Sequence, residues 1–285
     1  MRITFLGTGA SFGTPVIGCS CAVCRSPDPR NRRNRIGVWL HDGPSQSDRD
    51  LTEKALPYVS QVAGLVRREP DPSDGVSCVI DVSSDFRHAC LANGLKRVDF
   101  TLLTHPHSDH ISGLDDLRTF TLTSGIPMPI YADKRTLEEL RVRYAYAFNP
   151  PKGYGGGIPR FLLREVDAPF IEKGWRITPL PVMHGPEPIL GYRVNDFAMV
   201  TDVTAIPDST LALLENLDVL ALDCLWDAPH STHLSFDQAV AYALRIKAKR
   251  TYLIHLTHDL DHAETGSRLP PGIHVAYDGL TLETA

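Results

Sequence analysis

A dense group of metal-binding side chains lies between residues 105 and 110. The segment reads HPHSDH and places three imidazoles and one carboxylate within six residues. Neutral imidazole and carboxylate are ligands suited to Zn²⁺, Mn²⁺ or iron. The segment follows an apolar run, so His105 and His107 can face one position on the loop that leaves a strand. Asp109 and His110, at the start of the next helix, then face a neighbouring position. The spacing therefore predicts a metal centre.

Three cysteines within six residues form a second candidate metal site. Cys19, Cys21 and Cys24 occur at a density that, in a cytosolic protein, indicates a metal site rather than disulfides. The alternative is three free thiols in an exposed loop. Three thiolates and one nitrogen make a closed tetrahedral zinc site. We select His258 as the fourth ligand, with His262 as the second choice.

The 105–110 segment resembles the HxHxDH signature of the metallo-β-lactamase superfamily. The resemblance extends along most of the chain. It implies that His184 in PVMHGPE closes the first metal position, that Asp202 in AMVTDVT bridges both ions, and that His255 in YLIHLTH completes the second. It also implies an α/β (α+β) fold, a four-layer αββα sandwich with the metals along one edge. The implied active-site ligands are His105, His107, Asp109, His110, His184, Asp202 and His255.

The cysteine motif narrows this resemblance. Together with a preceding GTGAS turn and the HLTH segment, CxCxxC resembles the phosphoribosyl cyclic phosphodiesterases of the carbon–phosphorus lyase pathway, which implies a structural zinc of the Cys₃His kind. A pyrroloquinoline-quinone biosynthesis protein shares the cysteines but does not keep an intact HxHxDH. The chain departs from the phosphodiesterases by the segment Gly43–Gly75, which leaves the substrate open.

The expected reaction is hydrolysis of a small phosphodiester, with a ribosyl cyclic phosphodiester as one candidate. Two divalent ions, zinc or manganese, would bridge a hydroxide and lower its pKa towards neutrality. We assign Asp109 and His233 as catalytic residues. His233, in STHLSFDQA, lies where phosphodiesterases of the family carry an extra histidine, and we expect it to protonate the leaving alkoxide. His230 is the alternative acid, and Asp81 is expected to orient a histidine ligand.

Other functions remain open at this point. A tRNA 3′-end endonuclease shares the histidine set and a similar HLT segment, but the net charge of −5 disfavours a nucleic-acid partner. The Arg25–Arg35 strip is more simply a solvated loop. A non-catalytic cofactor-biosynthesis module is disfavoured by the intact ligand set. Thioester or lactam hydrolysis stays possible because a fold alone does not select the bond that is cleaved.

Short apolar runs must form the strands that position these residues, because each ends in a polar and often metal-binding residue. They cover residues 3–6, 78–80, 100–103, 177–183, 198–200 and 252–254. Ser235 followed by Gln238 predicts a capped helix. Further helices are expected at Ile111–Thr121, Asp208–Leu217 and Leu51–Arg67.

The chain of 285 residues, with 42% hydrophobic and 22% charged residues, suits one globular α/β unit over residues 1–285. We expect insertions at about 43–75 and at about 146–159, the latter a Gly/Pro-rich loop. No stretch approaches the roughly 20 apolar residues that span a bilayer, so we expect a cytoplasmic protein that does not bind membranes. The expected partner is a small phosphodiester, and a homodimer is possible.

Overall fold

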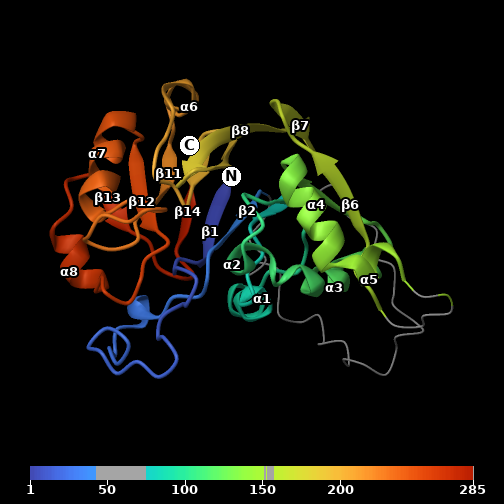
Figure 1. The fold of residues 1–285 in the computed structure, drawn as a ribbon, viewed down its shortest axis with the longest axis horizontal. Helices are drawn as coiled ribbons and strands as arrows, with labels where there is room; N and C mark the ends of the chain where they lie inside the picture. The colour runs from blue at the N-terminus through green and yellow to red at the C-terminus, as the bar shows by residue number, and fades with distance from the viewer. Residues whose placement is uncertain (43–74, 151, 153–156, 285) are drawn as a thin grey trace.

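The structure is a computed structural model that describes residues 1–42, 75–150, 152 and 157–284. Its described part contains two seven-stranded sheets that pack face to face (Figure 1). Both sheets are mixed, with parallel and antiparallel neighbours. The expected Gly43–Gly75 insertion and the Leu51–Arg67 helix fall almost wholly outside the described residues.

The first sheet has the order β14-β1-β2-β3-β4-β5-β6. Strands β3 to β6 run parallel to one another, whereas β1, β2 and β14 join by antiparallel pairing. The bounds are β14 Thr281–Glu283, β1 Arg2–Gly7, β2 Gly37–His41, β3 Ser77–Ile80, β4 Phe100–Leu102, β5 Met128–Ala132 and β6 Phe161–Glu165.

The second sheet has the order β13-β12-β11-β10-β9-β8-β7. Strands β10 to β13 are parallel, and the long β8–β9 hairpin pairs antiparallel beside them. The bounds are β13 Ile273–Val275, β12 Arg250–Ile254, β11 Val219–Asp223, β10 Phe197–Val200, β9 Glu187–Val194, β8 Trp175–His184 and β7 Phe170–Glu172.

Three apolar clusters hold four layers together. The inner cluster includes Phe5 and Phe100 of the first sheet with Tyr192 and Phe197 of the second. A second cluster packs the outer face of the second sheet against helices, and a third does the same for the first sheet. Alternate strand residues thus face two different cores, which is why the strands are apolar almost throughout. The predicted four-layer αββα sandwich is confirmed.

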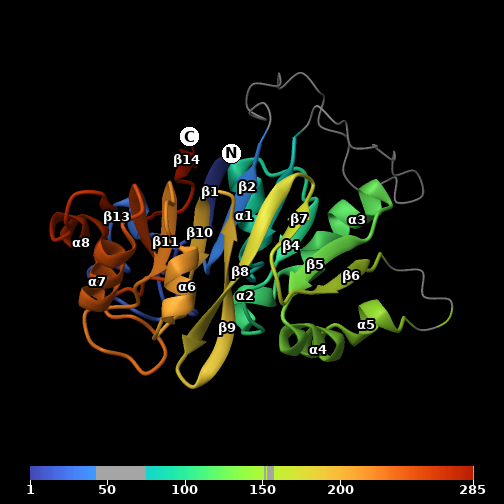
Figure 2. The same ribbon diagram turned by 90° about the horizontal axis from the view of Figure 1, so that it is seen from above.

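The helices cover the outer faces of both sheets (Figures 1 and 2). Their bounds are α1 Phe86–Asn93, α2 Ser108–Ile111, α3 Arg118–Ser124, α4 Lys134–Arg143, α5 Ala145–Phe148, α6 Asp208–Leu213, α7 Phe236–Ile246 and α8 His262–Ser267, with 3₁₀ turns at Pro29–Asn31 (η1) and Leu114–Leu117 (η3). The Ser235–Gln238 capping box at the start of α7 is confirmed.

Three expected helical or loop segments differ from the prediction. The single helix expected at Ile111–Thr121 is interrupted, because α2 ends at Ile111 and the chain turns at Gly113 before η3 and α3. A Cβ at Gly113 would lie 2.0 Å from the carbonyl oxygen of Ser83, so this close approach requires glycine. Helix α6 ends at Leu213 instead of about 217.

The expected loop at 146–159 is helical at its start, since α5 covers 145–148. Residues 151 and 153–156 of this segment lie outside the described part of the chain. Among the described helices, none has the length and apolar character required to cross a membrane.

Candidate metal centre

The candidate ligands lie where strands end at one edge of the sandwich. His184 is the last residue of β8, while Asp202 and His255 follow β10 and β12 closely. Asp202, His255 and Asp81, just after β3, have φ of 56°, 61° and 59°. This left-handed conformation is uncommon except for glycine, and Asp and His adopt it more readily than most other residues. The same turn thus directs three strand ends towards the site.

Ligand atoms of His105, His107 and His184 lie within 4.8 Å of one another and form the first donor group. His184 Nδ1–H donates to the carbonyl oxygens of Asp202 (2.7 Å) and Thr232 (2.9 Å). His105 Nδ1 lies 3.0 Å from the Thr104 hydroxyl, whose own proton goes to Asp81. Both rings therefore carry a proton on Nδ1 and keep the Nε2 lone pair for a metal, with His105 Nε2 3.0 Å from His107 Nδ1 of the same donor group.

The second donor group contains Asp109, His110, Asp202 and His255, all buried. As expected for the start of a helix, Asp109 and His110 belong to α2. His110 Nδ1–H donates to Asp81 Oδ2 at 2.7 Å, which confirms that Asp81 contacts a histidine of the site. The Asp202 carboxylate lies between the groups, with Oδ1 3.9 Å from His105 Nε2 and Oδ2 3.4 Å from His110 Nε2.

Electrostatics show that this cluster needs positive charge at its centre. Burial alone would lower the pKa of His110 and of His255. The nearby carboxylates, Asp202 first, outweigh burial. They raise the pKa of His255 to about 9 and the pKa of His110 well above its ordinary value. The same imidazoles outweigh burial at Asp109 and Asp202 and hold their pKa far below the usual range. Burial keeps the pKa of His105 low. In the metal-free chain, the raised pKa of His110 and of His255 favours their protonated forms beside the carboxylates.

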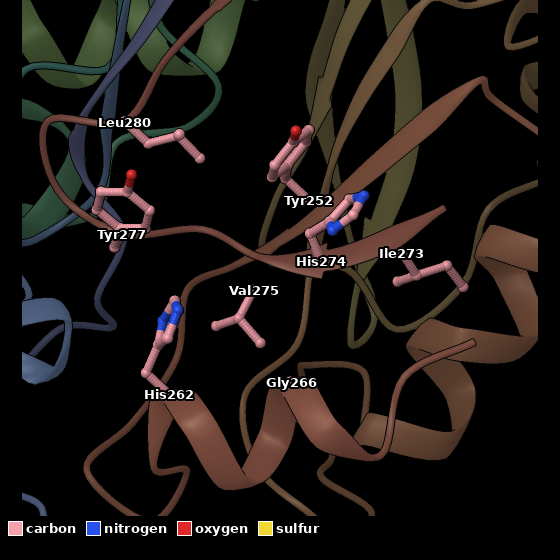
Figure 3. A pocket seen from close by; sticks show the side chains of 8 residues that line it. All are labelled: Tyr252, His262, Gly266, Ile273, His274, Val275, Tyr277 and Leu280. Atoms are coloured by element: carbon pink, nitrogen blue, oxygen red, sulfur yellow. The ribbon is translucent and has the colours of Figure 1, made fainter. Parts of the chain in front are cut away.

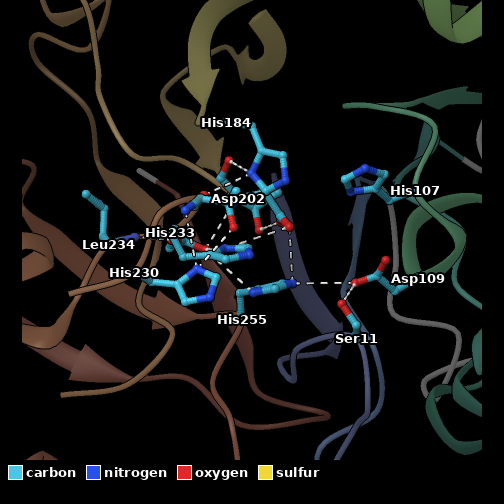
Figure 4. A network of polar contacts seen from close by, with 12 residues as sticks. Ser11, His107, Asp109, His184, Asp202, His230, His233, Leu234 and His255 are labelled. Carbon is cyan, nitrogen blue, oxygen red and sulfur yellow. Dashed lines mark hydrogen bonds and ion pairs between the residues drawn. The ribbon is translucent and has the colours of Figure 1, made fainter. Parts of the chain in front are cut away.

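The spacing of the donors fits a metal ion better than it fits hydrogen bonds. His255 Nε2 lies 3.3 Å from Asp202 Oδ1 and 3.6 Å from Asp109 Oδ2. Nε2 of His110 and of His255 are buried without a hydrogen-bond partner in the described chain. A tetrahedral ion with metal–ligand distances of about 2.1 Å separates its ligands by about 3.4 Å. The buried His and Asp groups are thus consistent with a dinuclear metal site (Figure 4).

A buried acid–histidine pair lies beside this centre. His233 Nδ1 lies 3.3 Å from Asp223 Oδ1, and its ring stacks on His255 at 4.8 Å between centroids. Asp223 also accepts the backbone N–H groups of Asp202 (3.0 Å) and Leu234 (2.8 Å). One carboxylate thus orients His233, the Asp202 turn and the approach to α7.

The sequence reasoning assigned no role to Asp223, although a signal was present. It ends the apolar run of β11, as His184 ends that of β8. The sequence analysis also gave Ser11 no role. Its hydroxyl donates to Asp109 Oδ2 at 2.7 Å, and the one sequence feature that could have indicated this contact is the GTGAS turn, which ends at Ser11. His230, the alternative acid, is partly exposed, and its Nδ1 accepts the N–H of Thr232 at 3.3 Å.

The three cysteines converge on His258, as predicted. His258 Nδ1 lies 3.3, 3.4 and 3.5 Å from the sulfurs of Cys19, Cys21 and Cys24. Zn–S and Zn–N bonds of about 2.3 and 2.05 Å put these atoms about 3.6 Å apart in a tetrahedron. The backbone N–H of Cys24, together with His258, lowers the pKa of the Cys21 thiol to about 6. This group could therefore hold a structural metal.

His262, the second choice for this site, belongs to neither donor group. It starts α8, packs edge-on against Tyr277, and burial lowers its pKa to about 4. It lines a separate hollow of about 270 Å³ between α8, β12 and β13, together with Tyr252 and His274 (Figure 3).

Comparisons with known proteins agree with this geometry. Residues 76–256 match the family model of the beta-lactamase superfamily domain, and the chain belongs to the metallo-β-lactamase superfamily. Its fold and its buried His and Asp groups are those expected of a metal-dependent member of that superfamily. The crystal structure of a diphosphatase from the PhnP family is 36% identical, with a TM-score of 0.83, and the alignment covers 100% of this chain and 98% of that one.

Two further relatives show how far the likeness extends. An octanoyltransferase of Porphyromonas gingivalis is 34% identical over 284 residues, which cover 98% of this chain and 51% of that protein. The chain thus spans about half the length of this curated relative. Zinc-bound PqqB from Methylobacterium extorquens has a TM-score of 0.71 over the full length of both chains, but at 17% identity it shares the fold alone.

Proposed function

We propose that this chain hydrolyses a small phosphodiester, with ribosyl cyclic phosphates as the preferred class. The observation that carries the proposal is the buried His233–Asp223 pair against the His255 ring. Esters of good leaving groups need no proton donor, whereas an alkoxide expelled from a sugar does. The 36% identity to a diphosphatase of the PhnP family supports phosphorus as the reacting centre.

Seven residues would hold two divalent ions, zinc or manganese: His105, His107, Asp109, His110, His184, Asp202 and His255. Bound there, the ions would neutralise the phosphate charge and lower the pKa of water. Asp202 faces both donor groups, and the Ser11 hydroxyl donates to Asp109 Oδ2, the same oxygen that lies beside His110 and His255. Cys19, Cys21, Cys24 and His258 would hold a structural zinc.

His233 acts on the leaving group. Water supplies the oxygen of the new P–O bond, one ester P–O bond breaks, and the ring donates a proton to the departing alkoxide. Asp223 accepts from Nδ1–H, which leaves Nε2 as the donor towards the substrate. Asp109 contributes as a ligand whose carboxylate lies beside both His110 and His255.

A hydrolysis screen of the metal-loaded protein tests the proposal. It compares bis-p-nitrophenyl phosphate, 2′,3′-cyclic nucleotides, a ribosyl 1,2-cyclic phosphate, a thioester and a β-lactam. We expect turnover of the phosphodiesters, with the ribosyl cyclic phosphate best. Turnover of only the thioester or the lactam would contradict it. Cleavage of tRNA with steep salt dependence would instead favour the endonuclease.

A further inference from the structure

The hollow between α8, β12 and β13 lies outside both the metal centre and the cysteine group (Figure 3). None of its lining residues belongs to a metal-donor group of the described chain. The proposed hydrolysis therefore gives the hollow no role. Besides aliphatic side chains, its lining contains four rings and one glycine: Tyr252, His262, His274, Tyr277 and Gly266.

The four rings form two walls of the hollow. Tyr252 and His274 are partners in the parallel β12–β13 pair, and their rings stack with centroids 5.1 Å apart. His262 packs edge-on against Tyr277 with centroids 5.7 Å apart. Figure 3 shows this second pair across the hollow from the first, with Val275 between them. A flat ring that enters the hollow can therefore contact aromatic groups on two sides, as a base does on aromatic side chains.

Polar atoms of these rings have no partner within the described chain. His262 is only 8% exposed, yet its Nδ1 is buried without a hydrogen bond. The hydroxyls of Tyr252 and Tyr277 also form no hydrogen bond with another described residue. A buried polar group without a partner is costly and uncommon in a folded protein. A ligand with its own donors and acceptors would supply the missing hydrogen bonds.

The lining of the hollow carries no formal charge. No Lys, Arg, Asp or Glu occurs among its described lining residues. Burial, with Arg30 and Arg33 nearby, lowers the pKa of His262 to about 4, so its neutral ring offers one donor and one acceptor. Arg30 itself is paired with Asp28 at 2.8 Å. An anion would lose hydration here without gaining a cationic partner, so the hollow suits a neutral ligand.

The size of the hollow indicates the ring system that fits. A cavity of roughly 150 Å³ holds benzene, so a hollow of about 270 Å³ accommodates a bicyclic ring. We infer that the hollow is a separate ligand site that binds a neutral, planar heteroaromatic ring of purine size, as in a nucleoside. The ring lies between the two aromatic pairs and forms a hydrogen bond with His262.

Calorimetric titration of the metal-loaded chain with adenosine tests this assignment. A Cβ at Gly266 meets no atom within 4 Å, so Gly266→Leu can add a side chain beside the hollow without a clash. This variant should weaken adenosine binding about 5- to 100-fold, the range of one lost base-stacking contact.

His262→Phe tests the hydrogen bond separately. It keeps a ring against Tyr277, and the backbone N–H of residue 262 still donates to Asn31 Oδ1. The lost ring nitrogens should weaken adenosine binding about 2- to 10-fold, the range of one hydrogen bond. Because the imidazole forms no hydrogen bond within the described chain, this variant keeps the test decisive even if Gly266→Leu does not fold.

Two control variants locate the binding. Ser267→Leu adds the same side chain at the next position of α8, which is exposed and does not line the hollow, and should leave adenosine binding unchanged. His107→Ala disrupts the metal centre and should also leave it unchanged. Ribose alone, which has no aromatic face, should not bind.

Three results would overturn the inference. The first is the absence of adenosine binding to the unaltered chain at millimolar concentration. The second is binding that is lost in His107→Ala but kept in Gly266→Leu and His262→Phe, because the nucleoside would then occupy the metal centre. The third is equal weakening in Ser267→Leu and Gly266→Leu with no effect of His262→Phe, because the effect would then belong to α8 as a whole.

Discussion

His255 and His258 are three positions apart on one segment after β12, yet they face two different donor groups. His255 joins the buried His and Asp group, whereas His258 joins the three cysteines. The buried Arg33 donates to the carbonyl oxygens of Thr257 and Leu260, both at 2.6 Å, and fastens this segment to the N-terminal loop. The cysteine group therefore anchors a segment that also carries an active-site ligand.

The first prediction concerns metal content. Two positions in the active site and one among the cysteines should give close to three metal ions per chain, at least one of them zinc. Elemental analysis of protein prepared without chelator measures this number. Two ions or fewer after metal supplementation would remove the structural zinc.

The second prediction separates the two kinds of site. Cys21→Ser should lower the thermal stability because structural zinc binding is coupled to folding. Each kcal/mol lost lowers Tm by about 2–4 °C for a chain of this size, so we expect a drop of at least about 5 °C. The folded fraction should keep most of its turnover. His107→Ala should abolish turnover with a smaller loss of Tm. An unchanged Tm in Cys21→Ser would mean that the cysteines hold no metal.

The third prediction tests His233 as the general acid. His233→Ala should slow cleavage of ribosyl or alkyl phosphodiesters about 10²–10⁴-fold. Nitrophenyl esters should be spared because nitrophenolate leaves without a proton. Rates on both substrates, with the metal content of the variant checked, give the answer. Equal losses would show that His233 shapes the site, and His230 would become the candidate.

The fourth prediction concerns Asp223 as a positioning residue. Asp223→Asn keeps a carbonyl oxygen but weakens the contact with His233 Nδ1, so it should slow ribosyl substrates roughly 10- to 100-fold. The loss should depend on the leaving group as it does in His233→Ala, and the double variant should be no slower than His233→Ala. Independent, multiplying losses in the double variant would contradict a role through His233.

The fifth prediction is a pH dependence of the metal-free chain. The pKa of His255 is raised from 6.5 to about 9 in the folded state, with Asp202 as its main partner and burial opposing. Its stabilising effect is therefore present below pH 6.5 and is lost as the pH rises through 9, on the order of 3 kcal/mol. Urea unfolding in chelator from pH 6 to 9.5 should show this loss.

Metal-loaded protein is the control for that experiment, because bound ions require neutral imidazoles and remove the dependence. His255→Gln should reduce the slope of the curve of the metal-free chain, and the remaining slope should come from His110, whose pKa is also raised. A metal-free stability that is constant or increases between pH 6.5 and 9 would show that His255 is not protonated in the cluster.

The sequence determined the composition of the metal centre, because the chemistry of HPHSDH and CxCxxC is local. Neighbouring side chains on a short loop or at a helix start can adopt few directions. The sequence therefore predicted that His105 and His107 belong to one donor group and that Asp109 and His110 belong to the other. The strands could also be predicted from the sequence, since a strand buried on both faces is apolar without interruption. Helix ends were harder to predict: the expected helix is interrupted at Gly113, whose backbone N–H donates to the Val82 carbonyl oxygen and whose approach to Ser83 leaves no room for a Cβ.

Only the tertiary structure decided which distant residues support the centre. Asp223, 10 residues from His233, and Ser11, 98 residues from Asp109, meet their partners where segments that leave the strands of one sheet fold over its edge. The choice of His258 over His262 was likewise decided by α8, whose start turns His262 towards Tyr277. Arg135 and Glu187, an ion pair between α4 and β9, lie in ordinary polar sequence. Their pairing follows from the packing of α4 beside β9, which depends on contacts across the whole fold rather than on neighbours in the chain.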